Sequence, residues 1–168
     1  LMAWIAARGA RLTHAVVTHF HLDRTAGLEL LNQAGVSTYA LDKTNQHLVS
    51  LGQVPASQSI EQSEFELDAG IHVFYPGPGH SDDNVVVWLK EQQILFGGCF
   101  VKSLSAKSLG YLGDADVQRW RESLGNTQKQ FSLENAIIVP GHGSQGGQQL
   151  LDHTATLVQD YLSKNETD

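Results

Sequence analysis

The sequence has little of several features that would mark a special class of protein. Its 168 residues include one cysteine, so no disulfide can form within the chain. Its apolar runs are far shorter than the roughly 20 residues of a membrane-spanning helix. Eleven Lys and Arg stand against eighteen Asp and Glu, with no basic cluster. Nucleic acid and membranes are therefore not expected as partners.

Glycine and histidine, by contrast, are well represented, with 16 and 8 residues. Hydrophobic residues make up 41% of the chain and charged residues 17%, which is typical of a folded protein rather than a disordered one. The length suits one domain with a sizeable core, and neither a repeat nor a linker interrupts it. We therefore expect a single domain over residues 1–168.

Apolar patterns predict strands and helices that alternate along the chain, which is typical of an α/β fold with helices packed on a sheet. The predicted strands are 15–17, 37–41, 64–67, 71–75, 84–89, 94–96 and 136–139. The predicted helices are 1–12, 25–34, 42–51, 114–130 and 148–163. Gly35 is expected to end the second helix in a left-handed conformation, and Asp42 and Asp114 can cap the next two.

Three potential metal ligands follow the first strand directly. His19, His21 and Asp23 form an H-x-H-x-D pattern. In an extended segment residues two apart point the same way, so we expect these side chains to converge before the next helix begins. On this segment alone, a polar loop with hydrogen-bonded histidines is the alternative.

Three later strands repeat this arrangement. Each is followed by glycine and then by a nitrogen or sulfur ligand, namely His80, Cys99 and His142. Glycine lets the backbone turn sharply, and sites in α/β proteins favour the carboxyl ends of strands. The alternative for Cys99 alone is a small buried hydrophobic residue.

Six ligands are too many for one tetrahedral zinc ion but suit two ions with three protein ligands each. Imidazole and thiolate favour zinc over magnesium or calcium. Closed structural sites use four protein ligands, so three per ion favours catalytic positions that are open to water and substrate. The other histidines lack such glycine-led loops, and we interpret them as ordinary polar residues: His14, His47, His72 and His153.

Four motifs in this order resemble the class B β-lactamases of the metallo-β-lactamase superfamily. They are H-F-H-L-D-R, G-H-S-D-D-N, G-G-C-F-V-K and P-G-H-G, starting at residues 19, 79, 97 and 140. The resemblance implies two zinc ions. It assigns His19, His21 and His80 to the first ion, and Asp23, Cys99 and His142 to the second. Other hydrolases of the superfamily, such as glyoxalase II, carry a histidine where this chain has Arg24 and a bridging carboxylate in place of Cys99.

The resemblance also implies roles around the metal. Lys102 matches the position that holds the substrate carboxylate, and it is counted with Asp23 as a catalytic residue. Arg24 matches a position that braces the metal ligands. Tyr111 stands where many family members have an asparagine that polarises the lactam carbonyl, so we expect it to contact substrate, although its exact role stays open.

The expected activity is zinc-dependent hydrolysis of the β-lactam amide bond in penicillins, cephalosporins and carbapenems, which confers antibiotic resistance. A zinc-bound hydroxide is the expected nucleophile. The S-x-x-K motif of serine β-lactamases is absent. Two alternatives stay open: another zinc hydrolase of the superfamily, acting on a thioester or phosphodiester, and a non-catalytic zinc-binding module.

The family fold is an αββα sandwich whose β-rich N-terminal half precedes the H-x-H-x-D segment. By this comparison the chain lacks that half and corresponds to the C-terminal major part of a longer enzyme. We expect that enzyme to be a monomer exported to the periplasm, with no signal peptide in the present sequence. We also expect this chain alone to expose a face of its sheet and to be poorly stable.

Overall fold

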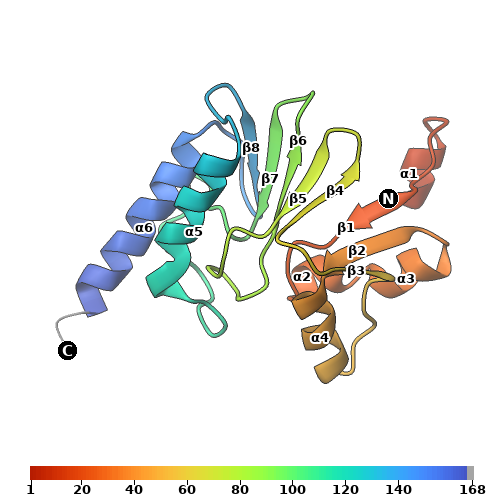
Figure 1. The fold of residues 1–168 in the computed structure, drawn as a ribbon, viewed down its shortest axis with the longest axis horizontal. Coiled ribbons are helices and arrows are strands. Elements are labelled where there is room, and N and C mark those ends of the chain that lie inside the picture. The colour runs from red at the N-terminus through yellow and green to blue at the C-terminus, as the bar shows by residue number, and fades with distance from the viewer. Residues whose placement is uncertain (166–168) are drawn as a thin grey trace. The chain divides into compact units, whose positions relative to one another are not determined.

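The computed structural model describes residues 1–165 and contains two units, Leu1–Glu61 and the residues from Gln62 onward (Figure 1). Each unit combines a sheet with helices, so the expected mixed α/β class is confirmed. Each unit also has its own hydrophobic cluster. The single domain expected over residues 1–168 stays a prediction.

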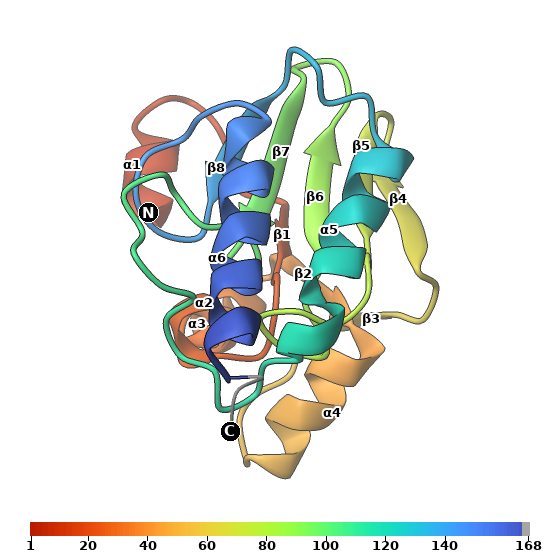
Figure 2. The same ribbon diagram turned by 90° about the vertical axis from the view of Figure 1, so that its left-hand side faces the viewer.

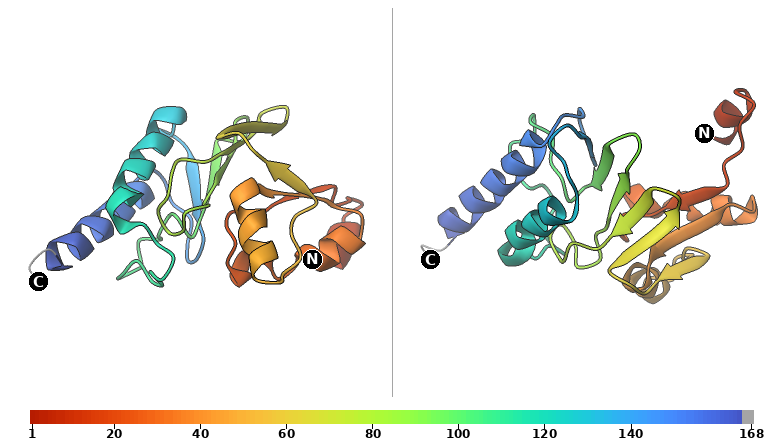
Figure 3. Two further views of the ribbon diagram at one scale, coloured as in Figure 1. Left: turned by 60° about the horizontal axis from the view of Figure 1, so that its bottom comes forward. Right: turned by 45° about the horizontal axis from the view of Figure 1, so that its top comes forward.

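The first unit is built on three parallel strands in the order β1-β2-β3 (Figure 3). Its strands are β1 (His14–Val16), β2 (Ser37–Leu41) and β3 (Gln58–Ile60). Its helices are α1 (Met2–Ala6), α2 (Leu22–Thr25), α3 (Leu28–Gln33) and α4 (Asp42–Ser50). The helices α3 and α4 contact β2, and Leu28 and Leu48 fill the core between these elements.

Several predicted boundaries in this unit were wrong. The predicted helix 25–34 corresponds to the shorter helix α3, and the separate helix α2 over Leu22–Thr25 was not predicted. The N-terminal helix is only five residues long, and the chain then turns at Gly9 with φ +69°. Strand β3 was missed because two of its three residues, Gln58 and Ser59, are polar and exposed. Gly35 has the expected left-handed conformation, with φ +73°.

The second unit is a five-stranded sheet in the order β4-β5-β6-β7-β8. Its strands are β4 (Glu64–Asp68), β5 (Ile71–Phe74), β6 (Val86–Leu89), β7 (Ile94–Gly98) and β8 (Ile137–Pro140). Strand β6 is antiparallel to both β5 and β7, and β8 is parallel to β7. The strands β5, β7 and β8 therefore run in one direction, and their carboxyl ends lie at the same edge.

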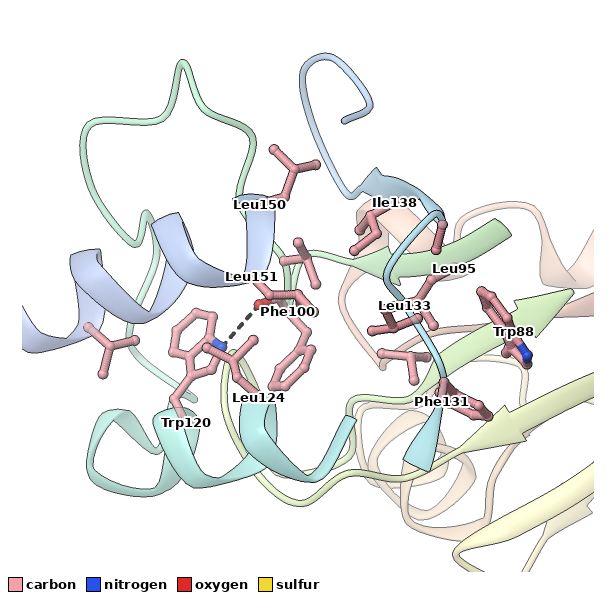
Figure 4. Close-up of a cluster of buried hydrophobic side chains, with 14 of the residues drawn as sticks. Trp88, Leu95, Phe100, Trp120, Leu124, Phe131, Leu133, Ile138, Leu150 and Leu151 are labelled. Atoms are coloured by element: carbon pink, nitrogen blue, oxygen red, sulfur yellow. Dashed lines mark hydrogen bonds between the residues drawn. The ribbon is translucent and has the colours of Figure 1, made fainter. Parts of the chain in front are cut away.

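Two long helices, α5 (Val117–Gln130) and α6 (Gln149–Asn165), lie side by side on one face of this sheet (Figure 2). Trp120 and Leu124 of α5 and Leu151 of α6 are buried against sheet residues such as Leu95 (Figure 4). Helix α5 begins three residues later than predicted and is capped by Asp116, not Asp114.

Within residues 1–165, no helix is both long and apolar enough to cross a membrane.

Candidate metal centre

The H-x-H-x-D segment does not have the extended conformation that the sequence suggested. His19 and His21 lie in a bend, and Asp23 is in the first turn of α2. His19 and Asp23 nevertheless face each other, because a separation of four residues across the start of a helical turn brings side chains to one side. Their Nε2 and Oδ1 atoms are 3.7 Å apart.

Neighbouring groups orient these side chains. The Thr18 hydroxyl lies 3.3 Å from Nδ1 of His19, which directs the opposite ring nitrogen toward Asp23. The His19 and His21 rings meet edge to face with centroids 4.7 Å apart. Arg24 places its Nε atom 3.3 Å from Oδ2 of Asp23. Arg24 therefore contacts the carboxylate, as a residue that braces a metal ligand does.

In the second unit, the predicted ligands follow the three strands that run in the same direction. His80 comes after β5, Cys99 after β7 and His142 after β8. Since the carboxyl ends of these strands share one edge of the sheet, the topology brings the three ligand-bearing loops to that edge. This part of the sequence prediction agrees with the structure.

Cys99 and His142 are held close together by glycine. Residues of β7 and β8 pair up to Gly98 and Pro140, so the two loops begin side by side. A Cβ atom at Gly141 would lie only 2.6 Å from the Cys99 nitrogen and 2.7 Å from its Sγ atom. Only glycine allows this approach. Cys99 is buried, and it lines a pocket of about 300 Å³ together with His142.

The loop that carries His80 is fixed by hydrogen bonds at several points. The Asn84 side chain accepts from the Ser81 backbone nitrogen and donates to the Gly77 carbonyl. Ser123 of α5 donates to the Pro78 carbonyl at 2.6 Å. His80 itself is 5% exposed. The loop therefore presents His80 from a rigid frame.

Lys102 and Tyr111 have different positions. Lys102 lines the same pocket as Cys99 and His142. Tyr111 is 64% exposed, is not among the residues that line this pocket, and lies so close to Gly113 that a Cβ atom there would collide with the tyrosine hydroxyl. The geometry therefore supports Lys102 more directly than Tyr111 as a substrate contact.

The four histidines interpreted as ordinary polar residues make local contacts. His14 stacks on Tyr39, and His47 packs on Phe20. His72 lies 4.0 Å from the Glu64 carboxylate. His153 of α6 bonds to the Ala106 carbonyl at 3.0 Å, and so it holds the loop that follows Lys102.

Sequence reasoning missed the residues that support the ligands. Asn84 and Ser123 are not among the predicted site residues, and Trp120 is predicted only as part of a helix. One signal was available in the sequence. A loop rich in glycine and proline, such as 76–79, needs side chains elsewhere to satisfy its backbone carbonyls when it is buried.

The donor chemistry of both units fits zinc. Residues 1–61 offer two imidazoles and a carboxylate, and the second unit offers two imidazoles and a thiol. The glycine cradle around Cys99 and the shared pocket with His142 agree with a metal site, because ligand atoms must approach one another closely around an ion. Nitrogen and sulfur donors together favour zinc over magnesium or calcium.

Comparisons with known proteins agree with this chemistry. The family model described as the metallo-beta-lactamase superfamily matches residues 1–142. A metallo-beta-lactamase type 2 of Pseudomonas aeruginosa is 39% identical over 155 residues, which cover 92% of this chain and 61% of the relative. One from Bacillus cereus is 40% identical and covers 89% of this chain and 59% of its own length. The chain thus spans about three fifths of these curated relatives.

Solved structures of metallo-beta-lactamases are also similar to this chain. The DIM-1 metallo-beta-lactamase exposed to ceftazidime has a TM-score of 0.91 and 45% identity, covering 95% of this chain and 73% of that one. The mono-zinc form of FIM-1 from Pseudomonas aeruginosa has a TM-score of 0.89 and 33% identity, covering 95% and 72%. With a family model that matches most of its length, the chain belongs to the metallo-β-lactamase superfamily.

Proposed function

We propose that the protein is a zinc-dependent hydrolase that opens the amide bond of β-lactam antibiotics. The observation that carries this proposal is the pocket where Cys99, His142 and Lys102 come together. A thiol and an imidazole, both side chains that can bind zinc, line this pocket together with the cationic Lys102. The relatives named metallo-beta-lactamase type 2, about two fifths identical to this chain, support the same activity.

In this proposal two zinc ions are bound by three protein ligands each. His19, His21 and His80 bind the first ion. Asp23, Cys99 and His142 bind the second. When bound, zinc lowers the pKa of a coordinated water to about 7 and polarises a carbonyl oxygen. Arg24 holds the Asp23 carboxylate in place through its contact of 3.3 Å, and Thr18 orients the His19 ring.

Lys102 gives the pocket its substrate preference. Lys102 lines a space that is also bordered by small and hydroxyl side chains, including Ser105 and Ser108. A carboxylate on the substrate would gain about 1.5–3 kcal/mol from a charge-assisted hydrogen bond there. We assign Lys102 and Asp23 to the catalytic site, and Tyr111 to substrate contact from the exposed loop.

The wider setting is part of the same proposal. We infer a monomeric enzyme that is exported to the bacterial periplasm, acts on small-molecule antibiotics and confers resistance to them. The relation to enzymes named for β-lactam hydrolysis supports this setting.

Hydrolysis of a penicillin, a cephalosporin and a carbapenem, measured with added zinc and again with a chelator, tests the activity. We expect turnover that depends on zinc. Zinc binding without any lactam turnover would overturn the proposal. Hydrolysis of a thioester or phosphodiester in its place would identify another hydrolase of the superfamily, and no hydrolysis at all would indicate a binding module.

Replacement of Lys102 by alanine tests the substrate contact. The lost contact should raise KM for carboxylate-bearing β-lactams roughly 10- to 100-fold. The matched control is Lys107→Ala, because Lys107 is exposed on the same loop and does not line the pocket. An equal rise in KM in both variants would remove Lys102 from the substrate site.

Replacement of Cys99 by serine tests the second metal site. A serine hydroxyl does not supply the thiolate that zinc binds, so the zinc bound per protein molecule should fall from two toward one. Metal analysis after dialysis measures this ratio. The control Ser105→Ala changes the same pocket without removing a proposed ligand. Unchanged stoichiometry in Cys99→Ser would show that Cys99 is not a ligand.

A further inference from the structure

Trp120 stands at the centre of contacts that lead to the candidate site. It lies in the first turn of α5, is fully buried and belongs to the main core of the second unit. Figure 4 shows its indole ring beside Phe100, with a hydrogen bond between the two residues. Three separate contacts of this ring reach the segments that bear His80, Cys99 and Lys102.

The first contact fixes the backbone beside Cys99. The indole Nε1 of Trp120 donates a hydrogen bond to the Phe100 carbonyl at 3.0 Å. Both residues are buried, so water does not compete for this bond. Phe100 directly follows Cys99, and the bond therefore restrains the Phe100–Val101 peptide, one residue beyond this proposed metal ligand.

The second contact supports the loop of His80. The His80 and Trp120 ring centroids are 5.9 Å apart, within the range of aromatic pairs. A Cβ atom at Gly79 would lie 2.9 Å from Cδ1 of Trp120 and 2.7 Å from the Phe100 ring. The loop thus rests directly on these two aromatic rings, which leaves His80 little freedom to move.

The third contact reaches the cation of the pocket. The Lys102 Nζ atom is 5.4 Å from the centroid of the Trp120 ring, which is within cation–π range. Tryptophan is the best of the aromatic side chains for this attraction. The ring therefore helps to hold the ammonium group where a substrate carboxylate would meet it.

We propose that Trp120 is a positioning residue for the metal site and for the substrate-binding lysine. One rigid side chain contacts the Phe100–Val101 peptide next to Cys99, the loop of His80 and the ammonium group of Lys102. Loss of any of these contacts would change ligand geometry without removing a ligand. This inference rests on the proposed zinc-dependent function, although its first test does not need β-lactam turnover.

Replacement of Trp120 by phenylalanine tests the inference, because this variant keeps an aromatic ring but loses the indole N–H. The matched control is Trp88→Phe. Trp88 is 4% exposed in the same core and stacks on Phe131, so both changes shrink the same kind of buried side chain. Thermal unfolding of both variants measures the general cost to stability.

The decisive measurement is the affinity for Co²⁺, which is monitored through the absorption band of the cobalt–thiolate bond. Loss of a contact that orients a metal ligand typically weakens metal binding 10- to 100-fold. We expect Trp120→Phe to weaken Co²⁺ binding at the thiolate site by about tenfold. Trp88→Phe should bind like the unchanged protein. Equal Co²⁺ affinity in the two variants would overturn the proposal and leave Trp120 with a packing role.

Trp120→Leu removes the aromatic face, and it should also raise KM for a carboxylate-bearing β-lactam. If Trp120→Phe does not fold, benzothienylalanine at this position replaces the indole N–H by sulfur at nearly the same shape and tests the same hydrogen bond. A protein that binds Co²⁺ through its thiolate but hydrolyses no β-lactam would contradict the proposed function. The comparison of Co²⁺ affinities would still decide the role of Trp120.

Discussion

Tyr75 illustrates how one side chain stabilises a loop that carries a candidate ligand. Its hydroxyl donates a hydrogen bond of 2.8 Å to the Asp82 carbonyl and so closes the segment that contains His80. Burial, together with the nearby Asp82 carboxylate, raises the pKa of Tyr75 above its ordinary value of 10.0. The folded state therefore keeps this proton at a pH where the unfolded chain loses it.

This difference in the pKa of Tyr75 between the folded and unfolded states determines how stability changes with pH. As the pH rises above 10.0, the unfolded state loses the tyrosine proton first, so the contribution of Tyr75 to the free energy of unfolding declines. We expect Tyr75→Phe to lose about 1 kcal/mol of stability at pH 8, where the hydrogen bond is intact. The difference in the free energy of unfolding between this variant and the unchanged protein should become smaller above pH 10.

Urea unfolding of both proteins at pH 8 and above pH 10 measures the effect. Tyr161→Phe on α6 is the control, since Tyr161 is 39% exposed, and its stability should match the unchanged protein at both values. A gap that stays constant or widens with pH would contradict the assignment.

At the scale of elements, the start of α5 combines helix capping with support for the site. The Asp116 side chain accepts from the Arg119 backbone nitrogen at 3.0 Å and contacts its guanidinium at 2.7 Å. The Asp116 backbone nitrogen donates to the Gly79 carbonyl at 2.9 Å. Burial alone would raise the pKa of Asp116, but the two hydrogen bonds from Arg119 and the charge of its guanidinium lower it.

Removal of the cap should destabilise the protein by about 1 kcal/mol in Asp116→Ala. Asp116→Asn keeps the oxygen that accepts from the helix, so it should lose less, because a partly exposed ion pair adds little. The lowered pKa means that the charge stabilises the fold above pH 3.8 and that this contribution disappears as the pH falls through the lower folded value. Unfolding at pH 7 and pH 3 measures both effects. A larger loss in Asp116→Asn than in Asp116→Ala would contradict this view of the cap.

Sequence patterns predicted those helices and strands that are determined by residues close together in the sequence. Strands β5, β7 and β8 are apolar runs followed by glycine, and this pattern located His80, Cys99 and His142 correctly at strand ends. Strand β3 was missed because its polar residues pair with β2 only through the backbone. The start of α3 was predicted three residues too early because a single glycine, here Gly27, is also tolerated within a helix.

The H-x-H-x-D segment shows how side chains can face each other although the predicted local structure was wrong. An extended chain aligns residues two apart, whereas the observed bend and helical turn align His19 with Asp23, four apart. Support from Trp120 could not be predicted, since its contacts with His80, Phe100 and Lys102 join residues far apart in the sequence.

At the scale of the whole molecule, the proposed ligands are divided equally between two units. Residues 1–61 contribute His19, His21 and Asp23, and the later residues contribute the other three. A metal ion that binds the folded protein but not the unfolded chain adds to the stability of the fold. Zinc at about 100 times its dissociation constant would add about 2.7 kcal/mol to the free energy of unfolding.

Withdrawal of metal should therefore lower the unfolding temperature and abolish hydrolysis together. Thermal unfolding, followed by tryptophan fluorescence with zinc and with a chelator, measures the shift. His142→Ala should reduce the shift, whereas the control His72→Ala should retain it, because His72 contacts Glu64 and is not a proposed ligand. Identical unfolding with and without metal would contradict metal binding by the folded protein.

Because of the direction of its strands, the second unit has two sets of loops at opposite ends of its sheet. The loops with His80, Cys99 and His142 leave one edge of its sheet, whereas the turns Asp68–Gly70 and Lys90–Gln93 leave the opposite edge. These turns lie together, since the Lys90 nitrogen donates to the Gly70 carbonyl. A fluorescent label or an immobilisation tag inserted in these turns would therefore lie at the end of the sheet opposite the proposed metal ligands.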